Sequence, residues 1–146
     1  MNWYSIENIS LIDTPALVVF PERVQQNINL AIQMVGDINR LRPHIKTNKC
    51  REACQMMLDA GIQQFKCATI AEAELLAQLQ AKDVLLAYQP LGPKLQRFIE
   101  LIKKYPQTNF GCLTDNDAAA NEQAEAFAKA STKVRLFIDL NIGMNR

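Results

Sequence analysis

The sequence has a single histidine, little excess charge of either sign and no long apolar run, and each absence excludes a class of protein. Lysine and arginine total 16 and aspartate and glutamate total 15, so the formal net charge is only +1. Such a chain lacks the electrostatic footprint of a protein that binds nucleic acid or an anionic membrane. No apolar run reaches the roughly 18 to 20 residues that span a bilayer. We therefore expect neither nucleic acid nor membrane as a partner.

Export signals and metal-ligand clusters are missing as well. The start, MNWYSIENIS, has no basic segment followed by an apolar one, so we expect a cytoplasmic protein. The four cysteines, Cys50, Cys54, Cys67 and Cys112, are then predicted to be free thiols in a reducing compartment. Cys50 and Cys54 lie one helical turn apart, but no second pair of cysteines or histidines accompanies them. Buried small side chains explain them better than a metal site does.

What the sequence does contain is a regular alternation of apolar strands and amphipathic helices. Helical spacing or helix-end signals predict helices at 22–35, 50–61, 70–79, 93–105 and 116–129. Short apolar or extended runs predict strands at 15–20, 40–46, 65–69, 84–88, 109–113 and 134–142. Strict alternation with continuously apolar strands indicates an α/β protein whose parallel sheet is covered by helices.

Two α/β architectures fit this alternation. One is an open doubly wound sheet, and the other is part of a (β/α)8 barrel, which typically needs about 250 residues. The sequence stops at NIGMNR, directly after a strongly apolar strand that no helix follows. That ending favours the barrel, with further residues expected after Arg146.

The stretch RPHIKTNK, residues 42–49, places Lys46 at the carboxyl end of a predicted strand. Both architectures carry their active sites at that edge of the sheet. Partial burial can lower the pKa of a lysine, and a neutral amine can form a Schiff base with an aldehyde. From position alone, however, a solvated loop lysine is the simpler explanation.

RPHIKTNK resembles the lysine motif of the pyridoxal-phosphate enzymes of the alanine-racemase fold type. The resemblance is to the branch that contains D-threonine aldolase and eukaryotic-type D-serine dehydratase. Three further stretches are similar to motifs of this family in order and spacing: DTPALVVF (13–20), FKCATIAEAELL (65–76) and DLNIGMNR (139–146). The similarity runs across essentially the whole chain.

The resemblance implies the N-terminal portion of a (β/α)8 barrel. Barrel strands one to five would lie at 41–46, 65–69, 84–88, 109–113 and 134–141. Residues 1–146 would form one incomplete barrel domain, and residues 10–20 would pair with an absent β-rich domain. Full-length enzymes of this family usually form homodimers, so a homodimer is expected.

The resemblance also implies roles for individual residues. Lys46 would hold pyridoxal 5'-phosphate as an aldimine and later serve as a general acid or base. Arg146 would bind near the phenolic oxygen of the cofactor, although alone it reads as a terminal surface arginine. His44 would line the cofactor ring or orient a neighbour, and a purely structural histidine explains it equally well. Arg42 shares the parity of His44 but lies deeper, where a place in the barrel interior or a packed salt bridge is expected.

Two residues depart from the family pattern, and part of the site is not visible. Asn48 stands where the branch more often has histidine, and Asn141 stands where aspartate is usual. Gly92 and Gly143 are isolated turn residues, so no glycine-rich phosphate cradle is present. The phosphate loops, the partner of the pyridine nitrogen and the ligands of any divalent metal would lie outside this chain.

The function expected from these residues is a pyridoxal-phosphate enzyme acting on a D-amino acid or a D-3-hydroxy amino acid. Aldol cleavage, dehydration and racemisation all remain open, and the 146 residues alone are expected to be inactive. One alternative is a non-catalytic carrier of pyridoxal phosphate on a single barrel, against which the DTPALVV stretch argues. Another is a complete small α/β binding domain without a cofactor.

Overall fold

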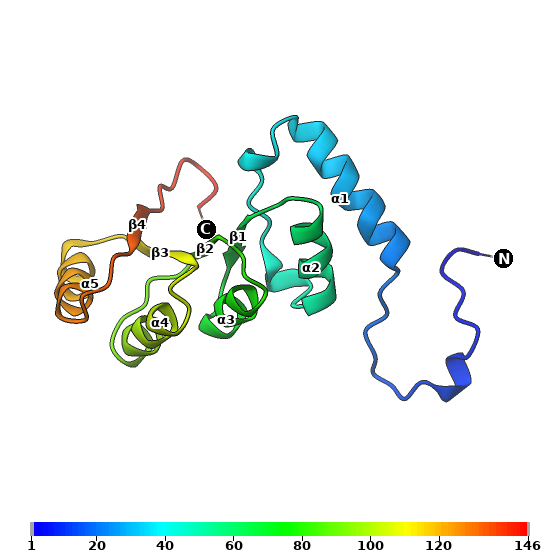
Figure 1. The fold of residues 1–146 in the computed structure, drawn as a ribbon, viewed down its shortest axis with the longest axis horizontal. Helices are drawn as coiled ribbons and strands as arrows, with labels where there is room; N and C mark the ends of the chain where they lie inside the picture. The colour runs from blue at the N-terminus through cyan, green and yellow to red at the C-terminus, as the bar shows by residue number, and fades with distance from the viewer. Residues whose placement is uncertain (1, 146) are drawn as a thin grey trace.

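A four-stranded parallel sheet organises the chain, which a computed structural model describes over residues 2–145 (Figure 1). The strands are β1 (Gln64–Cys67), β2 (Asp83–Leu86), β3 (Asn109–Thr114) and β4 (Arg135–Ile138). The helices are α1 (Pro21–Val35), α2 (Arg51–Asp59), α3 (Ile70–Gln78), α4 (Pro93–Lys104) and α5 (Asp117–Lys129). Short 3-10 turns lie at Ile9–Leu11, Ile38–Arg40 and Ile45–Thr47. The predicted alternation of strands and helices is confirmed from α2 onward.

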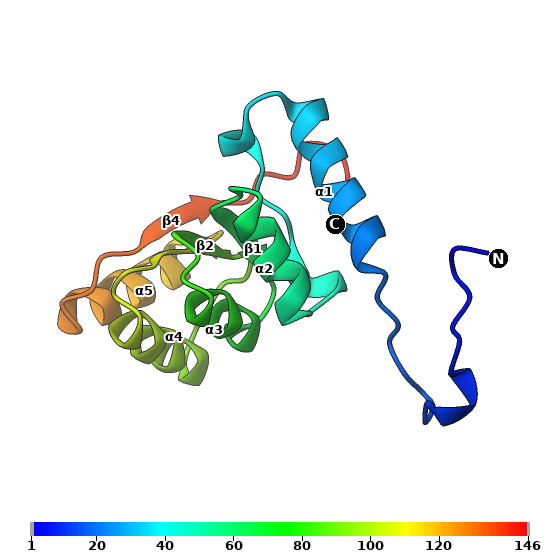
Figure 2. The same cartoon turned by 45° about the vertical axis from the view of Figure 1, so that its right-hand side comes forward.

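The order of the strands decides between the two architectures. The sheet runs β1-β2-β3-β4, each strand parallel to the next in sequence. Helices α3, α4 and α5 lie on the same side of the sheet (Figures 1 and 2). A doubly wound sheet reverses its strand order and carries helices on both faces. Sequential order with helices on one face is the arrangement of consecutive units of a barrel.

The core lies between this sheet and the helices. Strand residues alternate, so that Phe65, Val84 and Phe110 are buried on the helix side. The ring of Phe98 in α4 meets the ring of Phe110 edge to face, with centroids 5.8 Å apart. The opposite face carries polar residues such as Asp83, and it corresponds to the interior of a barrel.

Two predicted strands are not formed as expected. Residues 15–20 were predicted to be a strand, but they have no ladder partner among residues 2–145 and are not one. Residues 41–46 were predicted to be the first barrel strand. They pair with β1 only through a single parallel bridge between His44 and Lys66. Pro43 has no N–H to donate, and the chain turns into a 3-10 helix directly after His44. The sheet therefore has four strands instead of the expected five.

Residues 2–20 form an arm that extends from the body of the molecule (Figure 2). Trp3 packs against Phe20 with ring centroids 5.3 Å apart, and Leu11 and Leu17 are largely exposed. The pairing of residues 10–20 with a second domain stays a prediction. No helix within residues 2–145 is long and apolar enough to cross a membrane.

Candidate active site

Lys46 lies in the 3-10 turn Ile45–Thr47, immediately after the bridge that attaches His44 to β1. The turn is anchored by Ile45, which is fully buried, while the side chain of Lys46 is exposed. Because the bridge is parallel, the turn that follows it lies toward the carboxyl ends of the strands, as the sequence predicts. Lys46 makes no ion pair within the described chain, so its amine is available to a ligand.

His44 is joined to Lys46 by a hydrogen bond. The backbone N–H of Lys46 donates to Nδ1 of His44 at 3.2 Å. Since Nδ1 accepts, the proton of the neutral ring is on Nε2. Burial lowers the pKa of His44, and the charges of Lys46 and Lys66 lower it further, against an opposing effect of Glu72. His44 is therefore neutral at pH 7 and holds the backbone of Lys46 in place.

Lys66 is a third basic residue beside His44 and Lys46, and it was not predicted from the sequence. It is the bridge partner of His44 and lies between Phe65 and Cys67, which are both buried on the helix side. Strand alternation therefore directs Lys66 to the opposite face, together with His44. A lysine between two apolar residues of a short strand was the signal that would have identified it.

Glu72 supplies the negative charge nearest to this cluster. Its side chain is only 5% exposed, and Oε2 accepts a hydrogen bond from the backbone N–H of Ala68 at 2.7 Å. Its own N–H donates to Oγ1 of Thr69 at 3.2 Å, so Thr69 is the N-terminal cap of α3. Oε1 lies 3.7 Å from Nζ of Lys49, an ion pair beyond hydrogen-bond length.

The two asparagines that depart from the family pattern both support turns. Oδ1 of Asn48 accepts a hydrogen bond from the N–H of Cys50 at 3.2 Å, just before α2. This helix begins at Arg51, one residue after the predicted start at residue 50. Oδ1 of Asn141 accepts from the N–H groups of Gly143 and Asn145, each at 3.1 Å.

One predicted cofactor contact is not placed by the structure. Arg146, the predicted second cofactor contact, lies outside the described residues. Tyr88 lies two residues after β2, and Nζ of Lys94 lies 3.1 Å from its hydroxyl oxygen. Tyr88 and Lys94 line a cavity of about 210 Å³ together with Thr69. No cluster of metal-ligating side chains occurs within residues 2–145.

The cysteines are free thiols, as predicted. Burial raises the pKa of Cys54 to about 11 and the pKa values of Cys67 and Cys112 to about 12. These three thiols are therefore protonated packing groups, and only Cys50 is partly exposed.

Comparison with known proteins adds a family to this geometry. D-threo-3-hydroxyaspartate dehydratase of Delftia sp. (strain HT23) is 30% identical over 133 residues, which cover 83% of this chain and 33% of that protein. D-threonine aldolase from Filomicrobium marinum superposes with a TM-score of 0.81 at 26% identity, over 92% of this chain and 36% of that one. An alanine-racemase-like protein from Idiomarina loihiensis also gives 0.81, at 30% identity over 94% and 37% of the two chains.

These matches define what the described fold is. The chain spans about a third of the length of the relatives that it matches. Its four parallel strands therefore form a partial barrel of the alanine-racemase type. Residues 20–146 match the family described as "Alanine racemase, N-terminal domain". The chain belongs to this alanine racemase N-terminal domain family.

Proposed function

We propose that the protein is a pyridoxal-phosphate enzyme that acts on a D-3-hydroxy amino acid, with Lys46 as the residue that binds the cofactor. The observation that carries the proposal is the position of Lys46. Lys46 follows the bridge that joins His44 to the parallel sheet, in a turn held by a hydrogen bond to His44. Its amine is exposed and makes no ion pair within residues 2–145. The family implies the cofactor, and two relatives are named for D-threonine and D-threo-3-hydroxyaspartate, which are both D-3-hydroxy amino acids.

The residues around Lys46 suit an anionic aldehyde. Lys46 and Lys66 are both close enough to His44 to lower its pKa, and neither makes an ion pair within residues 2–145. Two amines without partners attract phosphate and phenolate groups. The Nε2–H of His44 is a further donor for such a ligand. The chemistry of this set therefore fits the cofactor that the family implies.

Each residue has a distinct part in the proposed reaction. When bound, pyridoxal phosphate accepts the electron pair of a bond broken at the Cα atom of an amino acid. Lys46 would bind the aldehyde carbon covalently and, once displaced by the substrate, hold or deliver a proton at Cα or Cβ. His44 would keep the turn of Lys46 in place by accepting its backbone N–H. Lys66 would balance the charge of the ligand.

Lys46→Ala tests the cofactor role. We expect the protein, expressed from its full gene, to develop a visible absorbance band with pyridoxal phosphate. Lys46→Ala should lose this band, because only Lys46 forms the covalent bond. Lys66→Met should bind the cofactor more weakly but still show the band. Absence of the band from the unmodified protein would overturn the proposal, and so would a band that Lys46→Ala keeps.

Product analysis separates the reactions. Aldol cleavage of D-threonine releases an aldehyde and glycine, whereas dehydration of a D-3-hydroxy amino acid ends in a 2-oxo acid and ammonia. We expect one of these pairs of products from the full-length protein, and none from Lys46→Ala. If the protein binds the cofactor and forms neither pair of products but converts the D-amino acid into its L-enantiomer, it is a racemase. If it binds the cofactor and converts nothing, it is the non-catalytic carrier.

A further inference from the structure

The segment that carries Lys46 is attached to the sheet by very little backbone. Strands β1 and β2 share four register pairs, whereas residues 41–44 contribute only the bridge between His44 and Lys66. The N–H of Lys66 donates to the carbonyl oxygen of Pro43 at 2.8 Å. With a single bridge, side chains must supply the rest of the attachment.

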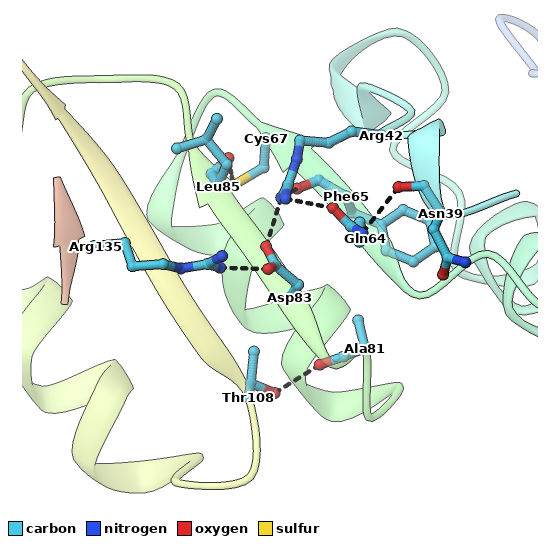
Figure 3. A network of polar contacts seen from close by, with 10 residues as sticks. All are labelled: Asn39, Arg42, Gln64, Phe65, Cys67, Ala81, Asp83, Leu85, Thr108 and Arg135. Carbon is cyan, nitrogen blue, oxygen red and sulfur yellow. Dashed lines mark hydrogen bonds and ion pairs between the residues drawn. The ribbon is translucent and has the colours of Figure 1, made fainter. Parts of the chain in front are cut away.

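Arg42 provides that attachment, four residues before Lys46. Its Nη1 donates to Oδ1 of Asp83 at 2.5 Å and to the carbonyl oxygen of Phe65 at 3.3 Å, and its Nη2 donates to Oε1 of Gln64 at 2.6 Å. The same Gln64 donates from Nε2 to the carbonyl oxygen of Asn39 at 3.0 Å. Figure 3 shows these contacts converging on the sheet face that the helices leave open. The salt bridge predicted for Arg42 is confirmed.

Asp83 extends the attachment to the other edge of the sheet. While Oδ1 accepts from Arg42, Oδ2 pairs with Nη2 of Arg135, the first residue of β4 (Figure 3). The side chain of Asp83 is only 15% exposed. Burial alone would raise the pKa of Asp83, but the hydrogen bonds from both guanidinium groups outweigh it and hold the pKa below its usual value. The carboxylate therefore stays charged between two cations.

This arrangement connects the two segments that carry the predicted cofactor contacts. Arg42 precedes Lys46 on one side, and β4 leads into the 139–146 stretch on the other. Within residues 2–145 the only side chain that pairs with both arginines is Asp83. We propose that Asp83 is a positioning residue, whose carboxylate couples the Lys46 segment to β4 and so fixes where the Lys46 amine lies.

Hydrogen exchange of the cofactor-free protein tests the coupling directly. In Asp83→Asn, an amide replaces an acceptor that serves two arginines, so we expect backbone amides of residues 41–49 to exchange about tenfold faster or more. The matched control is Glu74→Gln, which removes the same charge from the ion pair with Lys104 on the outer helices. This control should leave the exchange of residues 41–49 unchanged.

Arg135→Gln distinguishes coupling from general loosening. Arg135 contacts Asp83 but makes no hydrogen bond or ion pair to residues 41–49. If Asp83 couples the two segments, this variant also accelerates exchange in residues 41–49, and adding it to Asp83→Asn has little further effect. The side chain of Arg135 is half exposed, so this variant carries the test should Asp83→Asn not fold.

The consequence for the cofactor rests on the function proposed above. We expect Asp83→Asn to weaken apparent binding of pyridoxal phosphate about tenfold at equal folded fraction, and Glu74→Gln to leave it unchanged. Unchanged exchange in residues 41–49 of Arg135→Gln, or exchange that rises equally throughout β2, β3 and α4, would overturn the positioning role. Failure of the unmodified protein to bind the cofactor would instead overturn the proposed function and leave the exchange result standing.

Discussion

At the scale of single residues, His44 joins the local fold to the chemistry. It forms the only backbone bridge between residues 41–46 and β1, and its Nδ1 accepts a hydrogen bond from the N–H of Lys46. An imidazole can accept this bond only while Nδ1 is unprotonated. The turn that presents Lys46 therefore depends on a neutral histidine, which burial and two nearby lysines favour.

The stability of the protein should depend on pH through His44. The pKa of His44 is lowered from 6.5 in the folded state, so the unfolded chain binds its proton at a higher pH. This contribution to stability is present above about pH 6.5 and is lost as the pH falls through the folded pKa. We expect the free energy of unfolding to fall between about pH 7.5 and pH 5.5 in denaturant titrations.

The comparison variant is His44→Asn, which keeps an acceptor for the N–H of Lys46 but does not titrate. Because His44 is the chain's only histidine, this variant should lose most of the pH dependence in that range. His44→Phe should lose the acceptor as well and be destabilised by about 1 kcal/mol at pH 7.5. Equal pH dependence in His44→Asn and the unmodified protein would contradict this account.

Residue-level prediction from the sequence succeeded where chemistry and position agreed. Arg42 forms the salt bridge that was one of its two expected roles. Lys46 follows the bridge to β1, although it lies in a turn and not in a strand, and its cofactor role stays a prediction. Lys66 was missed, since only its pairing with His44 reveals which face it occupies. The hydrogen bond that Asn48 accepts from the N–H of Cys50 could not be predicted either, because it depends on a turn that the sequence does not specify.

At the scale of elements, the N-terminus of α3 is held by a reciprocal cap. Oγ1 of Thr69 accepts from Glu72, whose carboxylate reaches back to Ala68 instead of Thr69 itself. We expect Thr69→Ala to lower the free energy of unfolding by about 1 kcal/mol. Thr69→Ser retains the hydroxyl and should recover most of this loss in denaturant titrations. If the two variants were equally destabilised, the hydroxyl would not be the stabilising group.

The pairing of β3 with β4 depends on a glycine. A Cβ atom at Gly111 would lie 2.8 Å from Cε2 of Phe137 and 3.1 Å from the carbonyl oxygen of Arg135. We therefore expect Gly111→Ala to destabilise the protein by about 1–3 kcal/mol. Combining it with Phe137→Leu removes the closer contact and should restore part of the loss. A fully tolerated Gly111→Ala would show that β4 can move away from β3 without cost.

Helices were predicted more accurately than strands, for a physical reason. Amphipathic spacing and caps are local, so helix bounds differ from the prediction by no more than two residues. A strand needs a partner, and residues 15–20 have none within residues 2–145. Residues 41–46 have a partner in β1, but Pro43 and the turn at Ile45–Thr47 limit the ladder to His44.

At the scale of the whole molecule, apolar side chains are exposed at the β4 edge of the sheet. Ile138 is 71% exposed and Ile142 is 90% exposed, and β4 pairs only with β3 in the described chain. Exposed edges with apolar residues promote association. We expect residues 1–146 alone to associate with rising concentration in analytical ultracentrifugation, and Ile138→Lys to reduce this association.

The control for this prediction places the same charge elsewhere. Asn121→Lys adds a lysine to the exposed surface of α5 and should leave association unchanged. A stable monomer over the whole concentration range would contradict the expectation drawn from the exposed edge. The homodimer expected for the full-length protein stays a prediction, which the same measurement on that protein would test.

The central claim is that Lys46 is the residue that binds pyridoxal phosphate. Borohydride reduction converts a Schiff base into a stable secondary amine, which peptide mass spectrometry can assign to one lysine. After incubation with the cofactor and reduction, we predict the pyridoxyl group on Lys46 and unmodified amines on Lys49 and Lys66. A pyridoxyl group on Lys66 in place of Lys46, or on no lysine at all, would contradict the claim.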